Sequence, residues 1–131
     1  MKIDHVGIAV DKMEEALALY QRAFGLTLLH REDVPSQGVR VAFLGEPGCD
    51  VQVELLEPTA GDGAVARFLR ARGPGMHHLA FRSAAIEQEM SRLRAEGKPP
   101  LEDQPRAGAR GHRVCFLHPK QTAGTLIEIV G

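Results

Sequence analysis

Apolar and polar residues follow one another along the chain with two different periods. Runs in which every second residue is apolar predict strands, and an apolar residue at every third or fourth position predicts an amphipathic helix. In the first 60 residues these patterns predict, in order, a strand over 3–10, a helix over 12–24, and strands at about 26–32, 38–45 and 51–57. The first part of the chain, about 1–60, is therefore expected to fold as a βαβββ module.

The helix expected over 12–24 has one apolar stripe and a marked start and end. Its stripe consists of Met13, Leu17, Tyr20 and Phe24. Asp11 stands at the expected N-cap with Glu14 three residues later, which is the spacing of a capping box. Gly25 is expected to end the helix.

The same order of patterns returns in the second part of the chain. It predicts a strand over 77–82, a helix over 85–96, and strands near 100–103, 112–118 and 125–130. The apolar face of that helix is marked by Ile86, Met90 and Leu93. Between the two parts, residues 62–72 predict a linker helix. A second βαβββ module is therefore expected over about 75–131.

An internal repeat explains why the patterns return. The stretches HVGIA and HLAF begin 73 residues apart, as do GVRVAFL and GHRVCFL, and the stretches VEL and IEI begin 74 residues apart. Three blocks in the same order at a nearly constant offset indicate a tandem duplication. The sequence thus predicts an α+β fold, a single domain over 1–131, in which two βαβββ modules form an open cup.

Composition narrows the class of protein. With 44% apolar and 25% charged residues, the 131-residue chain has the balance of a soluble globular protein. No apolar run approaches the roughly 20 residues needed to cross a bilayer, so no membrane partner is expected. The charged N-terminus does not fit a signal peptide, and two cysteines, Cys49 and Cys115, favour a reducing cytoplasm. A net charge of −1 gives no reason to expect nucleic acid as a partner. Exposed edge strands favour a homodimer.

The repeat also selects the residues that carry chemistry. His5 and His78 occupy equivalent positions on the first strand of each module, and Glu54 and Glu128 occupy equivalent positions on the last strand. His77 and Gln52 are alternative candidates for two of these four positions. The offset of the repeat selects His78 over His77 and Glu54 over Gln52. An unpaired carboxylate inside an apolar strand would be costly. The four side chains form a mixed nitrogen and oxygen set that suits Co²⁺, Mn²⁺, Zn²⁺ or Ni²⁺.

These features resemble the vicinal oxygen chelate superfamily, which includes glyoxalase I, and within it the methylmalonyl-CoA epimerase family. The motifs that carry the resemblance span nearly the whole chain: DHVGIAV from Asp4, VPSQGV from Val34, VELLEP from Val53, GMHHLAF from Gly75, and FLHPK from Phe116 ahead of GTLIE from Gly124. The double histidine and the spacing from HPK to the last glutamate are specific to the epimerase branch.

The resemblance implies a function and a set of roles. The family interconverts the (R) and (S) epimers of methylmalonyl-CoA with a divalent metal, often cobalt. It implies that the metal ligands are His5, Glu54, His78 and Glu128. Some relatives carry a catalytic glutamate at the position of Val41. This chain lacks it, so Glu54 is expected to act with Glu128 as the pair of catalytic carboxylates.

Substrate contacts are expected outside that set. Gln37 lies in one of the family motifs, and Lys120 follows a strand in the basic part of the chain, where residues 66–131 carry 11 basic and 6 acidic side chains. Both are candidates for binding an acyl-CoA substrate, with Lys120 facing its phosphates.

Other functions remain open from the residues alone. The same fold serves glyoxalase-like isomerases, Fe(II) dioxygenases and metal-free binding proteins that sequester small molecules. A dioxygenase favours two histidines and one carboxylate, so the second carboxylate argues against it. A metal-free binding module has no need of two histidines and two glutamates at matching positions.

Overall fold

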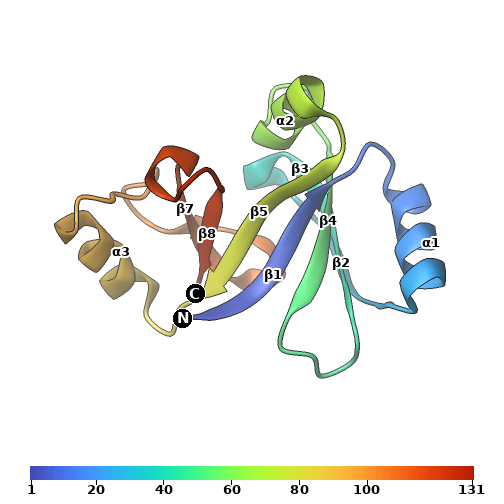
Figure 1. Cartoon of the computed structure of the whole chain (residues 1–131), viewed down its shortest axis with the longest axis horizontal. Helices are drawn as coiled ribbons and strands as arrows, with labels where there is room; N and C mark the ends of the chain where they lie inside the picture. The colour runs from blue at the N-terminus through green and yellow to red at the C-terminus, as the bar shows by residue number, and fades with distance from the viewer. The chain divides into compact units, whose positions relative to one another are not determined.

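The computed structural model describes residues 1–131. The α-helices and strands are β1 (Lys2–Ala9), α1 (Met13–Phe24), β2 (Thr27–Val34), β3 (Val39–Gly45), β4 (Gln52–Pro58), α2 (Ala64–Arg72), β5 (Gly75–Arg82), α3 (Ile86–Ala95), β6 (Arg106–Ala107), β7 (Arg113–Leu117) and β8 (Ile127–Val130). The α+β fold with two βαβββ modules is therefore confirmed, and α2 is the predicted linker helix (Figure 1).

The chain forms two compact units. The first unit comprises residues 5–77, and the second comprises residues 1–4 together with residues 78–131. The strand order is β2-β3-β4-β1 in the first module and β5-β8-β7-β6 in the second. The two orders correspond strand by strand, with β1, β2, β3 and β4 matching β5, β6, β7 and β8. Each module therefore places its first strand beside its last.

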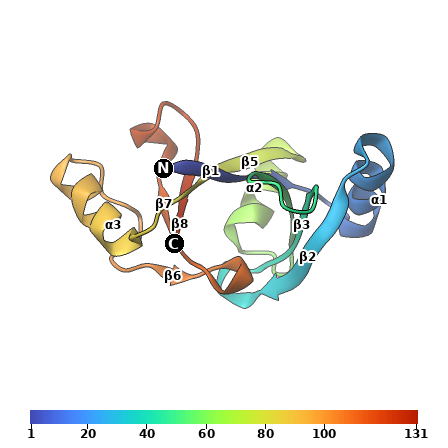
Figure 2. The same ribbon diagram turned by 90° about the horizontal axis from the view of Figure 1, so that it is seen from below.

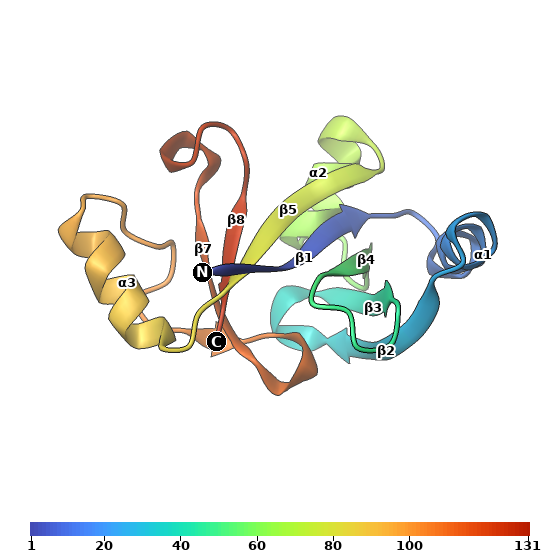
Figure 3. The ribbon, with the colours of Figure 1, turned by 60° about the horizontal axis from the view of Figure 1, so that its bottom comes forward.

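In the first unit, β4 pairs in parallel with β1 and antiparallel with β3, and β3 pairs antiparallel with β2 (Figure 3). Helix α1 packs against β4 and β2 on one face of this sheet (Figure 1). The buried residues of that layer are Val10, Met13, Leu17, Ala42, Leu44 and Leu55. Since side chains alternate along a strand, Val41 and Phe43 point to the opposite face.

In the second unit, β8 pairs in parallel with β5 and antiparallel with β7. Helix α3 packs on one face of these strands through Ile86, Met90, Cys115 and Ile129 (Figure 2). The other face carries a separate apolar cluster of Ala80, Val114, Phe116 and Val130. The predicted apolar face of α3 is confirmed, because Ile86, Met90 and Leu93 are all buried.

The strand predicted near 100–103 is wrong. The only strand at this place in the module is β6, which has two residues and pairs with the start of β7. Proline has no amide hydrogen, so Pro99 and Pro100 cannot continue a ladder. Instead, the Leu101 amide donates to the Phe116 carbonyl at 2.8 Å, and the Phe116 amide donates to Glu102 Oε2 at 2.8 Å. The Glu102 carboxylate thus accepts the hydrogen bond that the Phe116 amide of β7 would otherwise donate to the backbone carbonyl of a neighbouring strand.

The predicted cap of α1 is also wrong. The N-cap is Lys12, not Asp11, and no side chain at that position caps the helix. The Met13 amide donates instead to Glu57 Oε2 on β4, at 2.5 Å. Gly25 ends the helix in the left-handed conformation, with φ of 65°, as predicted. Phe24, expected in the apolar stripe, is 64% exposed, and its ring packs edge-on against Tyr20 one turn earlier.

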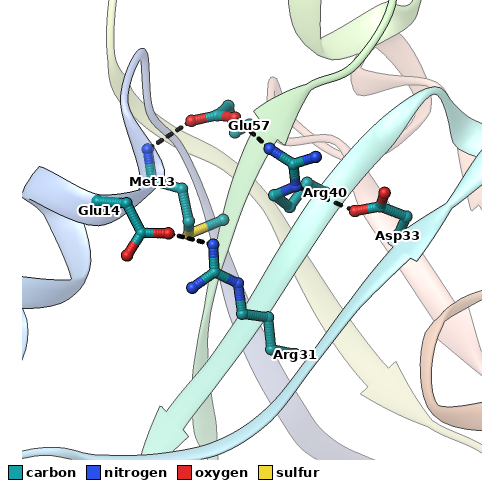
Figure 4. A network of polar contacts seen from close by, with 6 residues as sticks. All are labelled: Met13, Glu14, Arg31, Asp33, Arg40 and Glu57. Atoms are coloured by element: carbon teal, nitrogen blue, oxygen red, sulfur yellow. Dashed lines mark hydrogen bonds and ion pairs between the residues drawn. The ribbon is translucent and has the colours of Figure 1, made fainter.

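A network of charged side chains ties α1 to the sheet beneath it (Figure 4). Glu57 accepts from Arg40 at 3.3 Å, and Arg40 also donates to Asp33 at 3.1 Å. Glu14, expected in a capping box, pairs with Arg31 of β2 instead, and this hydrogen bond lowers the pKa of the Glu14 carboxyl. The helix is therefore capped and oriented by the strands, not by its own first turn.

No helix of the structure is long and apolar enough to cross a membrane.

Candidate metal centre

The first unit holds one histidine–glutamate pair on its two parallel strands. His5 lies on β1 and Glu54 on β4, and the register places Glu54 beside Gly7. Because Gly7 has no side chain, the space next to Glu54 is left to His5. His5 Nε2 and Glu54 Oε2 are 3.1 Å apart, and the two residues are 2% and 4% exposed. Both side chains are thus removed from water and held against each other.

The second unit repeats this arrangement. His78 lies on β5 and Glu128 on β8, and the register places Glu128 beside Ala80, another small residue. His78 Nε2 and Glu128 Oε2 are 3.0 Å apart, and both residues are buried. His77 points away from this pair, since its ring contacts Phe68 at 5.0 Å. The repeat register therefore chose the histidine that meets the glutamate.

Each of these histidines packs against a phenylalanine from its own module. The Phe43 ring meets His5 edge to face at 5.4 Å, and the Phe116 ring meets His78 in the same way at 6.2 Å. Such contacts fix the plane of an imidazole ring. Sequence reasoning did not single out these two residues, although they stand at matching places in the blocks GVRVAFL and GHRVCFL.

The donor set fits a divalent metal ion. A buried carboxylate is costly unless it is paired or coordinates a metal. All four side chains are buried, and each offers one nitrogen or oxygen ligand atom. Two imidazoles and two carboxylates are typical ligands of Zn²⁺, Co²⁺, Mn²⁺ and Ni²⁺. The predicted candidates for metal binding are therefore residues that the fold buries and pairs within each module.

The two expected substrate contacts lie in short 3₁₀ helices. Gln37 ends the segment Pro35–Gln37 and is half-buried, and Lys120 is exposed in Pro119–Gln121. The Lys120 backbone amide donates to His118 Nδ1 at 3.1 Å. Neither long side chain makes a hydrogen bond within the protein, so both are available to a ligand.

Cys115 is the small core residue that the repeat predicts. It is fully buried on β7 beneath α3. Burial is the main cause that raises the pKa of its thiol to about 12. A thiol that stays protonated is a poor nucleophile, so cysteine chemistry at this residue is not part of the site.

Comparison with known proteins settles the family. Residues 4–116 match the model of the Glyoxalase/Bleomycin resistance protein/Dioxygenase superfamily. The chain belongs to this superfamily. The chain is 35% identical over 130 residues to an ethylmalonyl-CoA/methylmalonyl-CoA epimerase of Cereibacter sphaeroides, covering 98% of this chain and 96% of that protein.

Solved structures agree with that similarity. The methylmalonyl-CoA epimerase of Mycobacterium tuberculosis superposes with a TM-score of 0.94 at 38% identity, covering 98% of this chain and 86% of that one. A variant of the Streptomyces coelicolor methylmalonyl-CoA epimerase, in complex with 2-nitronate-propionyl-CoA, has the same TM-score and identity and covers 99% and 96%. The predicted resemblance of this superfamily member to methylmalonyl-CoA epimerases is confirmed.

Proposed function

We propose that the chain is a metal-dependent epimerase that interconverts (R)- and (S)-methylmalonyl-CoA. The observation that carries this proposal is the duplicated pair of a buried histidine and a buried glutamate, 3.1 Å apart in one module and 3.0 Å apart in the other. The similarity to epimerases over nearly the whole chain supports the choice of substrate. A metal-free binding protein has no use for such pairs.

In this proposal the two modules form the predicted open cup, and the four side chains share one metal ion. His5, His78, Glu54 and Glu128 would hold the ion, with positions left for substrate oxygens. When bound, the ion supplies positive charge that lowers the energy of an enolate. Cobalt is the expected metal, and Zn²⁺, Mn²⁺ or Ni²⁺ are the alternatives.

The two glutamates would move the proton. One carboxylate removes the proton from the carbon between the thioester and the free carboxylate, and the C–H electron pair enters the enolate. The carboxylic acid of the other glutamate returns a proton to the opposite face of that carbon. Which of Glu54 and Glu128 acts first depends on the epimer bound. Positioned acid–base groups each contribute about 10²–10⁴-fold.

Glu54 has a particular place in this scheme. Val41, at the position where some relatives carry a catalytic glutamate, is fully buried and cannot act as a base. On the paired strand, Glu54 lies opposite Phe43, two residues along β3 from Val41 and on the same face. A carboxylate at Glu54 can therefore serve the same region of the module.

Deuterium exchange tests the proposal. Methylmalonyl-CoA is incubated with the protein in D₂O, with and without Co²⁺, and its mass is followed. The expected result is the metal-dependent gain of one deuterium, with Glu54→Gln and Glu128→Gln each slowing exchange at least 100-fold. Glu57→Gln is the matched control, since Glu57 lies on the same strand but caps α1. Full exchange in Glu128→Gln would end the two-carboxylate scheme.

Metal stoichiometry tests the shared site separately. The proposal expects one ion per chain, with His5→Gln and His78→Gln each removing tight binding. Two ions per chain, each lost with one variant, would mean that each pair binds its own ion. No bound metal under any loading condition would favour the binding module. A homodimer remains a prediction that the mass of the protein in solution can check.

A further inference from the structure

Helix α2 carries a cluster of arginines that have no carboxylate partner. Arg67, Arg70 and Arg72 are all exposed, and the helix contains no acidic residue. Arg67 donates to the Asp62 carbonyl, and Arg70 donates to the Gly61 carbonyl at 2.5 Å. Seven other arginines of the chain pair with carboxylates, namely Arg31, Arg40, Arg82, Arg92, Arg106, Arg110 and Arg113. The positive charge on α2 is therefore not neutralised locally.

An aromatic side chain, Phe68, lies beside one of these charges. The guanidinium of Arg72 stands over the Phe68 ring, 5.7 Å from its centroid. On another side, the His77 ring meets Phe68 at 5.0 Å with an interplanar angle of 81°. Phe68 is only half-buried, so part of a large apolar side chain remains exposed between two polar neighbours. A flat ring system could stack there.

Arg67 and Arg70 each keep N–H donors that are not used in these backbone contacts. A guanidinium has five N–H groups in a planar fork, which matches the oxygens of a phosphate. Arg67 and Arg70 each use one nitrogen on a backbone carbonyl. They are three residues apart, so both project from one side of the helix. Their backbone contacts hold the two guanidiniums close to the turn that precedes α2, where an anion could bridge them.

We define the α2 cluster as Arg67, Phe68, Arg70, Arg72 and His77. In the sequence its helix lies between two strands that carry proposed metal ligands. Helix α2 follows β4, the strand of Glu54, and leads into β5 (Figure 1). His77, which contacts Phe68, immediately precedes His78 on β5. The cluster is thus joined by continuous chain to two strands that carry proposed metal ligands, while the side chains of His77 and His78 leave opposite faces of β5.

We infer that the α2 cluster binds the nucleotide end of the CoA substrate. The adenine base would stack on Phe68 between Arg72 and His77, and the phosphates would accept hydrogen bonds from Arg67 and Arg70. This inference rests on the proposed function for its ligand. It also places the main phosphate contacts in the first unit, on the helix between the modules, and leaves Lys120 a secondary contact.

Kinetics on two substrates test the inference. Methylmalonyl-CoA is compared with methylmalonyl-pantetheine, which has the same acyl thioester and no nucleotide. In the triple variant Arg67→Gln, Arg70→Gln, Arg72→Gln, the KM for the CoA substrate is expected to rise by roughly tenfold or more, because charge-assisted hydrogen bonds to phosphate are lost. The kcat and the KM for the pantetheine substrate should not change. Equal KM changes for both substrates would overturn the inference.

A matched control separates this effect from a general loss of charge. Arg22→Gln removes an exposed arginine from the last turn of α1, where it too has no carboxylate partner. It is expected to leave the KM for methylmalonyl-CoA unchanged. If Arg22→Gln raises KM as much as one α2 substitution does, long-range charge explains the effect and the α2 cluster is not a site.

Direct binding gives a readout that does not depend on catalysis. Calorimetry with adenosine 3′,5′-bisphosphate is expected to show saturable binding that free CoA competes for and that the triple variant loses. Phe68→Leu should weaken the nucleotide but not inorganic pyrophosphate. Equal affinity for pyrophosphate and nucleotide in the unmodified protein would indicate a simple anion patch and overturn the inference. Deuterium exchange without nucleotide binding would refute the cluster alone, and nucleotide binding without exchange would refute only the epimerase.

Discussion

The carboxylate of Glu102 is expected to support both the stability of the second unit and the geometry of His78. Its Oε2 accepts the Phe116 amide at 2.8 Å, and its Oε1 accepts from Arg106 Nε at 3.0 Å. The Arg106 guanidinium in turn lies over the Phe116 ring, 5.3 Å from its centroid. Phe116 meets His78 edge to face. Removing the carboxylate therefore loosens the residue that packs against a proposed metal ligand.

The size of the effect of Glu102→Ala follows from these contacts. Phe116 is only 8% exposed, so its amide is left without an acceptor in a nearly dry place, at a cost of about 1–3 kcal/mol. The ion pair with Arg106 adds at most about 1 kcal/mol, because the arginine side chain is 40% exposed. Together these losses lower the free energy of unfolding by about 1–4 kcal/mol. Glu102→Gln keeps an acceptor oxygen and is expected to cost less than half of that.

Urea unfolding measures this difference at an unchanged m-value. The matched control is Glu96→Ala, which removes an exposed ion pair with Arg92 and is expected to cost less than about 0.5 kcal/mol. Calorimetry with Co²⁺ then follows the site, and Glu102→Ala should bind the ion more weakly than Glu102→Gln. The reasoning fails if the glutamine variant is as unstable as the alanine variant, or if neither differs from Glu96→Ala.

Four further predictions follow from other parts of the structure. Glu57→Ala should lower the free energy of unfolding by about 0.5–2 kcal/mol, because the Met13 amide loses its cap, and chemical denaturation measures this. Removal of metal by a chelator should lower the Tm, and Co²⁺ at 100 times its Kd should restore about 2.7 kcal/mol, or roughly 10 °C, in a thermal scan. Burial raises the pKa of Cys115 from 9.0 to about 12, so the unfolded thiol ionises first and stability should fall as pH rises from about 9 to 12, with no effect below. In a thiol titration at pH 8, the native protein should expose Cys49 alone, and both cysteines should react in denaturant.

The sequence predicted those parts of the fold in which one periodic pattern and one repeat block coincide. The first and last strands of each module lie within a residue or two of their expected bounds at most ends, and so does α3. Within these strands the register brings His5 to Glu54 and His78 to Glu128. Matching positions in a duplicated chain must meet matching neighbours, so the repeat carried information about contacts that composition and propensity lack.

The failures have a common cause. The cap of α1 comes from Glu57, which is 44 residues away from Met13 in the chain, so the local capping rule chose the wrong carboxylate. The edge of β7 is completed by the side chain of Glu102, and no strand pattern encodes that contact. In both places a carboxylate from a distant segment satisfies a backbone amide. A local pattern cannot predict such contacts, because they depend on tertiary packing.

The two modules differ at their outer edges and agree at their parallel strand pairs, which carry the proposed metal ligands. In the first module β3 has a full partner in β2, whereas in the second β7 has only the two residues of β6 and the Glu102 carboxylate. The proposed metal ligands lie on β1 and β4, and on β5 and β8, where a continuous backbone ladder sets the spacing within each pair. Ligand geometry tolerates errors of only about 0.5 Å. The repeat is therefore kept where backbone pairing positions the donors, and it is replaced by side-chain contacts where the edge needs only to be closed.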